Sequence, residues 1–324
     1  MVGWSDLPNP KAVLVINFRY HLVSLTAVFL ALTVGLILGT AALNGPAIEV
    51  LEANTQSLRD SNAQYRAEIE SLEAQLEDDQ SFATEIAPTY LTGQLTDQNI
   101  LVVALPGVET EVVDGVQQML DYAGAGSAGT ISILDDYFDP TNTDQLADLV
   151  ERVTPDTVEA PVTYDGVEAM SYVLAAVTTG TVDGKAVEIE DGDITTAITG
   201  LEELSMITVA DQPSGAATGV IVLGGQAFTD SDAEDRNAGV VSLATAYAGD
   251  APTVYGATSA VGDDNPVNTF RAEDSQVVIS TVDNVASPQG QIAAVVSLGD
   301  LISDGTEHDL GTGEGAEGLL PAAA

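Results

Sequence analysis

An uncharged run near the N-terminus, residues 22–43, most constrains how this chain can fold. Built as an α-helix, these 22 residues rise about 33 Å, which matches the roughly 30 Å hydrocarbon core of a bilayer. The apolar part of an export signal is shorter, about 7 to 15 residues, although the small residues 39–42 leave a late cleavage site as an alternative. The run predicts a transmembrane helix over residues 17–44, whereas a buried helix of a soluble domain fits its length less well.

The charges beside this run indicate its orientation. Lys11 and Arg19 precede it, whereas the first charged residues after it are Glu49 and Glu52. The cytoplasmic flanks of membrane spans carry an excess of Lys and Arg. We therefore expect a single-pass protein of the cell membrane, with residues 1–16 as a cytoplasmic tail and the bulk of the chain outside the cytoplasm, in the cell envelope.

A heptad pattern follows a predicted helix break at the Asn-Gly-Pro of residues 44–46. Over residues 46–80, apolar side chains recur at the a and d positions of successive heptads, a spacing typical of coiled coils. The pattern predicts a coiled-coil stalk that forms homo-oligomers, with an amphipathic helix packed on its own globular domain as the alternative. The expected interface residues are Ile48, Leu51, Leu58, Asn62, Tyr65, Ile69, Leu72 and Leu76.

Residues 96–302 alternate between short apolar runs and helical patterns. The apolar runs indicate buried strands at residues 99–106, 130–134, 219–225, 253–258 and 276–282. The helical patterns lie at residues 108–126, 142–153, 166–178, 193–204, 231–248 and 288–302. This alternation predicts the α/β fold class, with a layered domain around a mainly parallel sheet.

Two details complete the predicted domain organisation. Ser231 and Glu234 have the spacing of a capping box at the start of a helix. Residues 303–324 are rich in Gly and acidic side chains, and this composition predicts a flexible tail.

The charge balance excludes one class of partner. The chain has 50 Asp and Glu against 8 Lys and Arg, a net charge of −42, so it repels nucleic-acid phosphates. Such acidity fits adaptation to high salt, where cations screen a surface rich in carboxylates, and the alternative is a function that involves cations. The chain has no cysteine, which excludes disulfides, zinc sites built on cysteine and thiol catalysis.

No motif in the chain indicates catalysis, so we expect no enzyme and no catalytic residue. A Ser–His–acid site needs a positioned histidine, and in the predicted external part only His308 is available, within the tail. The acidic pairs at residues 135–136, 230/232 and 263–264 lie at the ends of elements, where capping and turns explain them. The LGGQA motif at residues 223–227 follows a strand; nearby acids disfavour a phosphate there, so we expect a tight turn.

Both ends of the chain resemble a known family. NFRYHLVSLTAVFLALTVGLILG (17–39) resembles the opening signature of the actinobacterial copper transporter family typified by mycobacterial copper transport protein B (MctB). ISTVDNVASPQGQIAAVVSLGDLISDGTEHDLGTGEGAEGLLP (279–321) is similar to the C-terminal end of that family. The resemblance covers residues 16–321 and implies a membrane-anchored envelope protein involved in copper homeostasis, with export of copper ions.

The residues themselves offer few copper ligands. Copper is held by thiolate, thioether and imidazole groups. The resemblance to mycobacterial members of the family implies several histidines in the tail, but the matching positions here are mostly Asp, Glu, Leu and Gly. We expect weak copper binding at His308 with Glu307 and Asp309, and no firmly bound cofactor. The predicted function is copper homeostasis or efflux; the alternative is a non-catalytic envelope scaffold whose coiled coil recruits or activates a cell-wall hydrolase or division partner.

Overall fold

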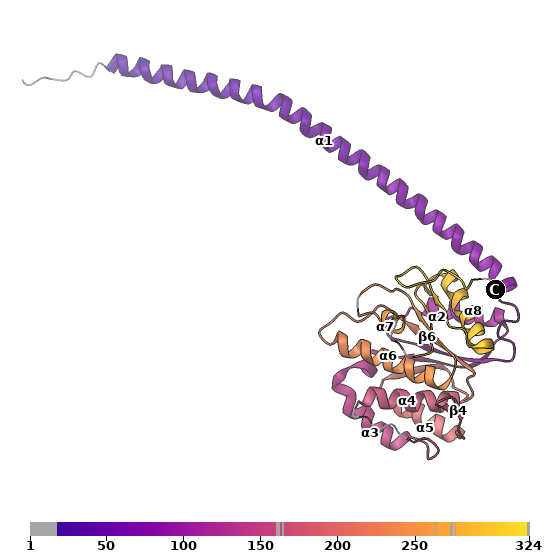
Figure 1. Cartoon of the computed structure of the whole chain (residues 1–324). Coiled ribbons are helices and arrows are strands. Elements are labelled where there is room, and N and C mark those ends of the chain that lie inside the picture. The colour runs from indigo at the N-terminus through magenta and orange to yellow at the C-terminus, as the bar shows by residue number, and fades with distance from the viewer. Residues whose placement is uncertain are drawn as a thin grey trace, which may run out of the picture. The chain divides into compact units, whose positions relative to one another are not determined.

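The computed structural model describes residues 18–159, 163, 165–262, 264–272, 275 and 277–322, with the side chains of residues 42–47 left out. The chain divides into two units, Met1–Gln75 and Leu76–Ala324, and each is described by itself. The described part of the first unit is helical and belongs to α1 (Phe18–Leu91), whose last turns lie in the second unit (Figure 1).

Helix α1 contains a segment, Phe18–Ala41, that is long and apolar enough to cross a membrane. This finding agrees with the span expected over residues 17–44. The helix also continues through residues 44–46, so the predicted break there is wrong. A proline inside a helix removes one backbone N–H donor, but the residues on both sides are mainly Ala, Leu and Glu, which favour helix.

The second unit is built on a seven-stranded sheet with the order β5-β2-β1-β6-β7-β8-β9. All neighbouring strands are parallel except β5, which runs antiparallel to β2 at one edge. The predicted α/β class with a mainly parallel sheet is confirmed. The strands are β1 (Asn99–Ala104), β2 (Gly126–Ile133), β5 (Ile207–Asp211), β6 (Gly219–Gly224), β7 (Thr253–Ala257), β8 (Ser280–Val282) and β9 (Asp309–Leu310).

Helices cover both faces of this sheet (Figure 1). One face is covered by α2 (Thr110–Ala123), α8 (Pro288–Asp304) and the end of α1. The other is covered by α3 (Thr143–Val153), α4 (Gly166–Thr179), α5 (Asp191–Glu203) and α6 (Ala233–Asp250). Because both faces are buried, β1 and β6 are continuous apolar runs, and their side chains alternate between the two cores.

The packed unit begins earlier than residue 96, where the sequence analysis placed its start. Ala83, Ala87 and Leu91 recur at helical spacing on α1 and are buried in the core beside α2 and α8. Small side chains at two of these positions let α1 lie close to the domain. The last turns of α1 therefore belong to the domain.

Several short elements were not predicted. They are β3 (Thr181–Val182) and β4 (Lys185–Ala186), which form a hairpin, the edge strand β5, the helix α7 (Pro266–Phe270), and the 3-10 turns η1 (Asp135–Phe138) and η2 (Pro140–Asn142). The predicted capping box of Ser231 and Glu234 is also wrong, because α6 begins after Asp232.

The C-terminal segment differs from the flexible tail expected over residues 303–324. Helix α8 extends to Asp304, and β9 then pairs in parallel with β8. The buried Asp283 accepts hydrogen bonds from the backbone N–H groups of Thr312 and Gly313, at 2.7 and 2.9 Å. The backbone hydrogen bonds of this segment explain its order, which composition alone does not reveal.

Candidate functional site

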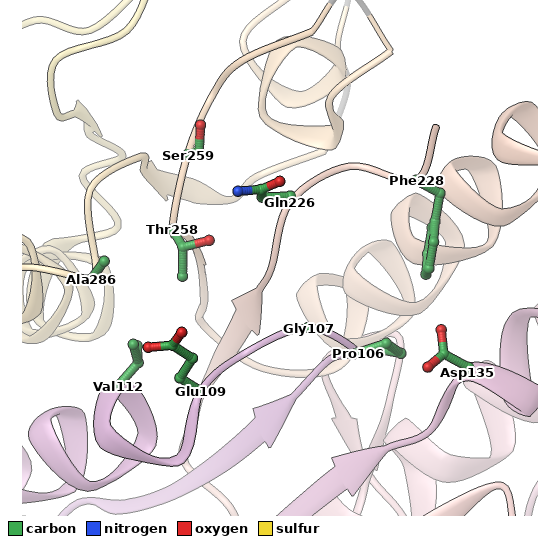
Figure 2. Close-up of a pocket in the computed structure, with 10 residues that line it drawn as sticks. All are labelled: Pro106, Gly107, Glu109, Val112, Asp135, Gln226, Phe228, Thr258, Ser259 and Ala286. Carbon is green, nitrogen blue, oxygen red and sulfur yellow. The ribbon is translucent and has the colours of Figure 1, made fainter. Parts of the chain in front are cut away.

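A cleft lies at the carboxyl ends of the strands, where the chain turns in opposite directions from β1 and β6. Strand β1 leads into α2 on one face of the sheet, and β6 leads into α6 on the other face. Ligands of open α/β sheets bind at such topological switch points. The cleft has a volume of about 500 Å³, and loops that follow β1, β2, β6, β7 and β8 line it (Figure 2).

Two glycines shape the floor of the cleft by close approach of backbone. A Cβ atom on Gly225 would lie 2.6 Å from the carbonyl oxygen of Pro106, so only glycine fits where the loops after β1 and β6 touch. Gly107 has a φ of 82°, a conformation that favours glycine. The LGGQA motif thus serves backbone packing. We had expected a tight turn at this motif. Neither Gly224 nor Gly225 has a positive φ, so a turn conformation is not the reason that glycine is needed there.

Four polar side chains line one part of the cleft (Figure 2). Glu109 precedes α2 at its N-cap position, but its side chain makes no capping hydrogen bond and is exposed. Gln226 follows β6, and Thr258 and Ser259 follow β7. Parallel strands end at the same edge of the sheet, so the topology brings these four side chains to one place.

An arginine lies beside the other part of the cleft, in contact with the lining residues Asp135 and Phe228, and its charge is balanced. Arg236 on α6 donates to Asp135 at 2.6 Å and to Asp230 at 2.8 Å. Its guanidinium lies 3.6 Å from the ring centroid of Phe228, a cation–π contact. Asp135 and Asp230 were expected to act only in capping and turns. Asp230 does accept from the backbone N–H of Asp232, but both carboxylates also neutralise Arg236.

The three residues of the predicted copper site are not gathered into one site. His308 lies 2.9 Å, Nε2 to Oδ2, from Asp300 of α8. Asp309 accepts a hydrogen bond of 2.6 Å from the hydroxyl of Thr281, and Glu307 is exposed. Across the described residues, no group of three His, Cys, Asp or Glu side chains is placed to hold a metal ion. Met119, Met170 and Met206 are buried in the two cores.

The predicted stalk interface is a row of exposed side chains on α1. The exposed fractions of its apolar members range from 50% at Ile48 to 66% at Leu51. Asn62 is also exposed and donates to the carbonyl of Leu58 on its own helix, at 3.0 Å. The row comprises Ile48, Leu51, Leu58, Asn62, Tyr65, Ile69, Leu72 and Leu76. The coiled coil stays a prediction, because the structure contains one chain.

The cleft residues Glu109, Gln226, Thr258 and Ser259 were missed by the sequence analysis. Each follows a buried strand by a few residues, and this position is a usable signal once the strands are known to be parallel. What the sequence did not reveal is the order of the strands, which decides which of these loops are neighbours.

Known proteins match this chain over nearly its whole length. The family model described as "Copper transport outer membrane protein, MctB" matches residues 15–321. Proteins named "Copper transporter MctB" from Mycobacterium bovis and Mycobacterium tuberculosis are each 24% identical over 307 residues, covering 93% of this chain and 98% of the relative. The protein of that name from Mycobacterium leprae is 24% identical over 312 residues, covering 94% and 98%. The chain belongs to the MctB family.

Proposed function

We propose that this protein is a membrane-anchored envelope protein that contributes to copper homeostasis by promoting copper efflux. The observation that carries the proposal is the family match over residues 15–321, together with relatives named copper transporters along nearly their whole length. The apolar helix Phe18–Ala41 supports the anchor. The excess of basic residues before it supports a cytoplasmic N-terminus and an external domain.

The donor atoms of the domain favour weak and transient contact with copper. Copper prefers sulfur and imidazole ligands, and hard carboxylates hold it weakly. In the described part of the chain, His308 is the one histidine of the second unit, and it is hydrogen-bonded to Asp300. The protein therefore acts in copper balance without a tight resident copper site of its own. The described residues contain one helix apolar enough to span a membrane, which favours an accessory role over a pore formed by one chain.

Deletion of the gene in the source organism tests this role. The deletion strain is expected to stop growing at lower copper concentrations than the wild type and to accumulate more copper per cell, measured by mass spectrometry. The full chain supplied on a plasmid restores both values, and zinc tolerance serves as the control. Equal copper tolerance and equal copper content in the two strains would rule the proposal out.

A second candidate function has its own supporting observation, the exposed apolar row on α1. Apolar side chains in a row of this length are typical of a helix that meets a partner. On this interpretation the protein is a scaffold whose stalk self-associates and recruits a cell-wall hydrolase or division protein. The copper phenotype would then be absent, and deletion would disturb cell shape.

Substitutions at the d positions test the scaffold. Leu58→Glu combined with Leu72→Glu places charge in the seam, whereas Ala67→Glu places one on the opposite side of the helix. In membranes treated with a crosslinker, we expect the wild type and A67E to give dimers or partner adducts and the double variant to lose them. A wild-type chain that yields only monomer, with no adduct, contradicts self-association and the scaffold alike.

A further inference from the structure

We propose that the cleft at the carboxyl ends of β1 and β6 binds a neutral, hydroxyl-rich ligand of the size of one or two sugar units. The proposal rests on the geometry and chemistry of the cleft and is independent of the role in copper homeostasis. The cavity of about 500 Å³ lies within the usual range of roughly 300–1,000 Å³ for small-molecule sites.

The polar side chains of the cleft combine donors and acceptors. The carboxylate of Glu109 only accepts hydrogen bonds, the amide of Gln226 both donates and accepts, and the hydroxyls of Thr258 and Ser259 do both. A ligand hydroxyl also donates one hydrogen bond and accepts others. These four side chains can therefore bind several hydroxyl groups at once. Each ligand hydroxyl can donate a hydrogen bond to Glu109, or donate to and accept from the other three side chains.

An anionic ligand does not fit this lining. The residues that line the cleft include the carboxylates of Glu109 and Asp135 and no Lys or Arg. The cation next to it, Arg236, already faces two carboxylates at 2.6 and 2.8 Å. A phosphate placed here would meet negative potential from both ends of the cleft and from a chain of net charge −42.

A cationic ligand fits less well than a neutral one. An ammonium group only donates, so it can bond to Glu109 and the hydroxyl oxygens but cannot accept from the N–H groups of Gln226. One carboxylate is also already engaged, since Asp135 accepts from Arg236. A ligand hydroxyl accepts as well as donates, so it can pair with all four polar side chains.

The apolar part of the lining suits the carbon face of a sugar. Phe228 is half-buried, and its ring is oriented by the contact with Arg236 and by the ring of Phe138 at 6.2 Å. Val112 and Ala286 add aliphatic surface on the opposite side (Figure 2). Clefts that combine a few convergent polar groups with apolar walls are the usual form of small-molecule sites.

Ligand-observed NMR with the full chain in lipid nanodiscs tests the proposal. Nanodiscs are needed because maltoside detergents would compete for a sugar site. Two neutral disaccharides, cellobiose and N,N′-diacetylchitobiose, are the probes, and glucose 6-phosphate and glucosamine are the anionic and cationic comparators. We expect at least one neutral disaccharide to bind more tightly than both comparators.

Variants locate the binding. Glu109→Gln removes the carboxylate acceptor and Thr258→Val removes a hydroxyl with little change in shape, so each should weaken the neutral probe roughly tenfold or more. Glu202→Gln removes an equal charge from the exposed face of α5 and should leave binding unchanged. The melting temperature of each variant shows whether it is folded.

Three results would overturn the assignment. One is the absence of binding by both neutral disaccharides. Another is tighter binding of glucose 6-phosphate or glucosamine than of either neutral probe. The last is neutral-probe binding that survives unchanged in folded E109Q and T258V, since the ligand would then sit elsewhere.

Discussion

Asp250, the last residue of α6, is a buried carboxylate with one unmatched oxygen. Its side chain accepts a hydrogen bond of 2.9 Å from the backbone N–H of Asp183, in the turn of the β3–β4 hairpin. Within the described residues, its Oδ2 has no hydrogen-bond partner. Burial raises the pKa of Asp250 from 3.8 to about 7, and the nearby charge of Asp183 acts in the same direction.

This raised pKa predicts that the domain loses stability as pH rises. Between about pH 4 and pH 7 the unfolded chain has released the proton of Asp250 while the folded chain retains it, so the free energy of unfolding falls by up to about 4 kcal/mol. Asp250→Asn stays neutral and should be more stable than the wild type at pH 8, with a difference that shrinks toward pH 4. Urea unfolding at several pH values measures this.

The surface substitution Glu202→Gln is the control for Asp250→Asn. It also removes one negative charge, but from an exposed position on α5. If E202Q and D250N changed the free energy of unfolding equally at every pH, the effect of D250N would be one of net charge, and the burial of Asp250 would not matter.

A buried ion pair contributes, beside the pairing of β8 with β9, to holding the C-terminal segment on the sheet. Arg271, just after α7, donates to Asp283 at 2.8 Å, and both side chains are nearly inaccessible, 4% and 1% exposed. Arg271 also donates to the carbonyl oxygens of Leu310 and Glu314, at 2.8 and 3.0 Å. One guanidinium therefore connects the end of α7, the end of β8 and the C-terminal segment.

Removal of this guanidinium should release the C-terminal segment. Arg271→Ala leaves Asp283 buried and unpaired, which is expected to lower the free energy of unfolding by about 3–5 kcal/mol. The amide protons of Thr312 and Gly313 should then exchange faster with solvent. Arg152→Ala removes an exposed arginine of α3 and serves as the control. Unchanged exchange at residues 306–317 in R271A would show that β9 pairing alone orders the segment.

Some elements of this fold can be predicted from local sequence patterns, and others, such as the segment that contacts this ion pair, cannot. The strands β1, β6 and β7 and the helices α3, α4 and α8 were predicted because an apolar period and a terminal Gly or Pro are local signals. The C-terminal segment bonds to Asp283 and Arg271, about thirty and forty positions away in the sequence, so its own composition cannot predict its order. The short strand β5 was missed for a related reason, since its residues are mostly exposed and it exists through pairing with β2.

The candidate site, too, could be predicted from the sequence only in part. The sequence supplied the loops after each strand, but the cleft arises from the strand order β2-β1-β6-β7, which places loops from distant parts of the chain together. The predicted copper ligands are adjacent in sequence, but their side chains have different partners: His308 is hydrogen-bonded to Asp300, whereas Asp309 accepts from Thr281. Copper binding at these residues stays a prediction. Proximity in sequence was a poor guide to proximity in the site.

The whole molecule carries a net charge of −42, with 50 acidic side chains against 8 Lys and Arg. Arg236 and Arg271 are each paired with acidic side chains, so their positive charges are balanced locally and do not screen the other carboxylates. At low ionic strength the repulsion among the carboxylates opposes the compact state, and salt screens that repulsion over a Debye length of about 10 Å at 0.1 M and about 3 Å at 1 M.

We therefore expect added KCl to stabilise the protein. Between about 0.1 M and about 3 M KCl, the melting temperature should rise by roughly 10 °C, equivalent to about 3 kcal/mol for a domain of this size. Sucrose of equal osmolality is the control, because it stabilises proteins by exclusion from their surface without screening charge. Circular dichroism of the full chain in nanodiscs provides the measurement. A melting temperature that stays level or falls in KCl, or that rises as much in sucrose, would remove the link between the acidic surface and salt.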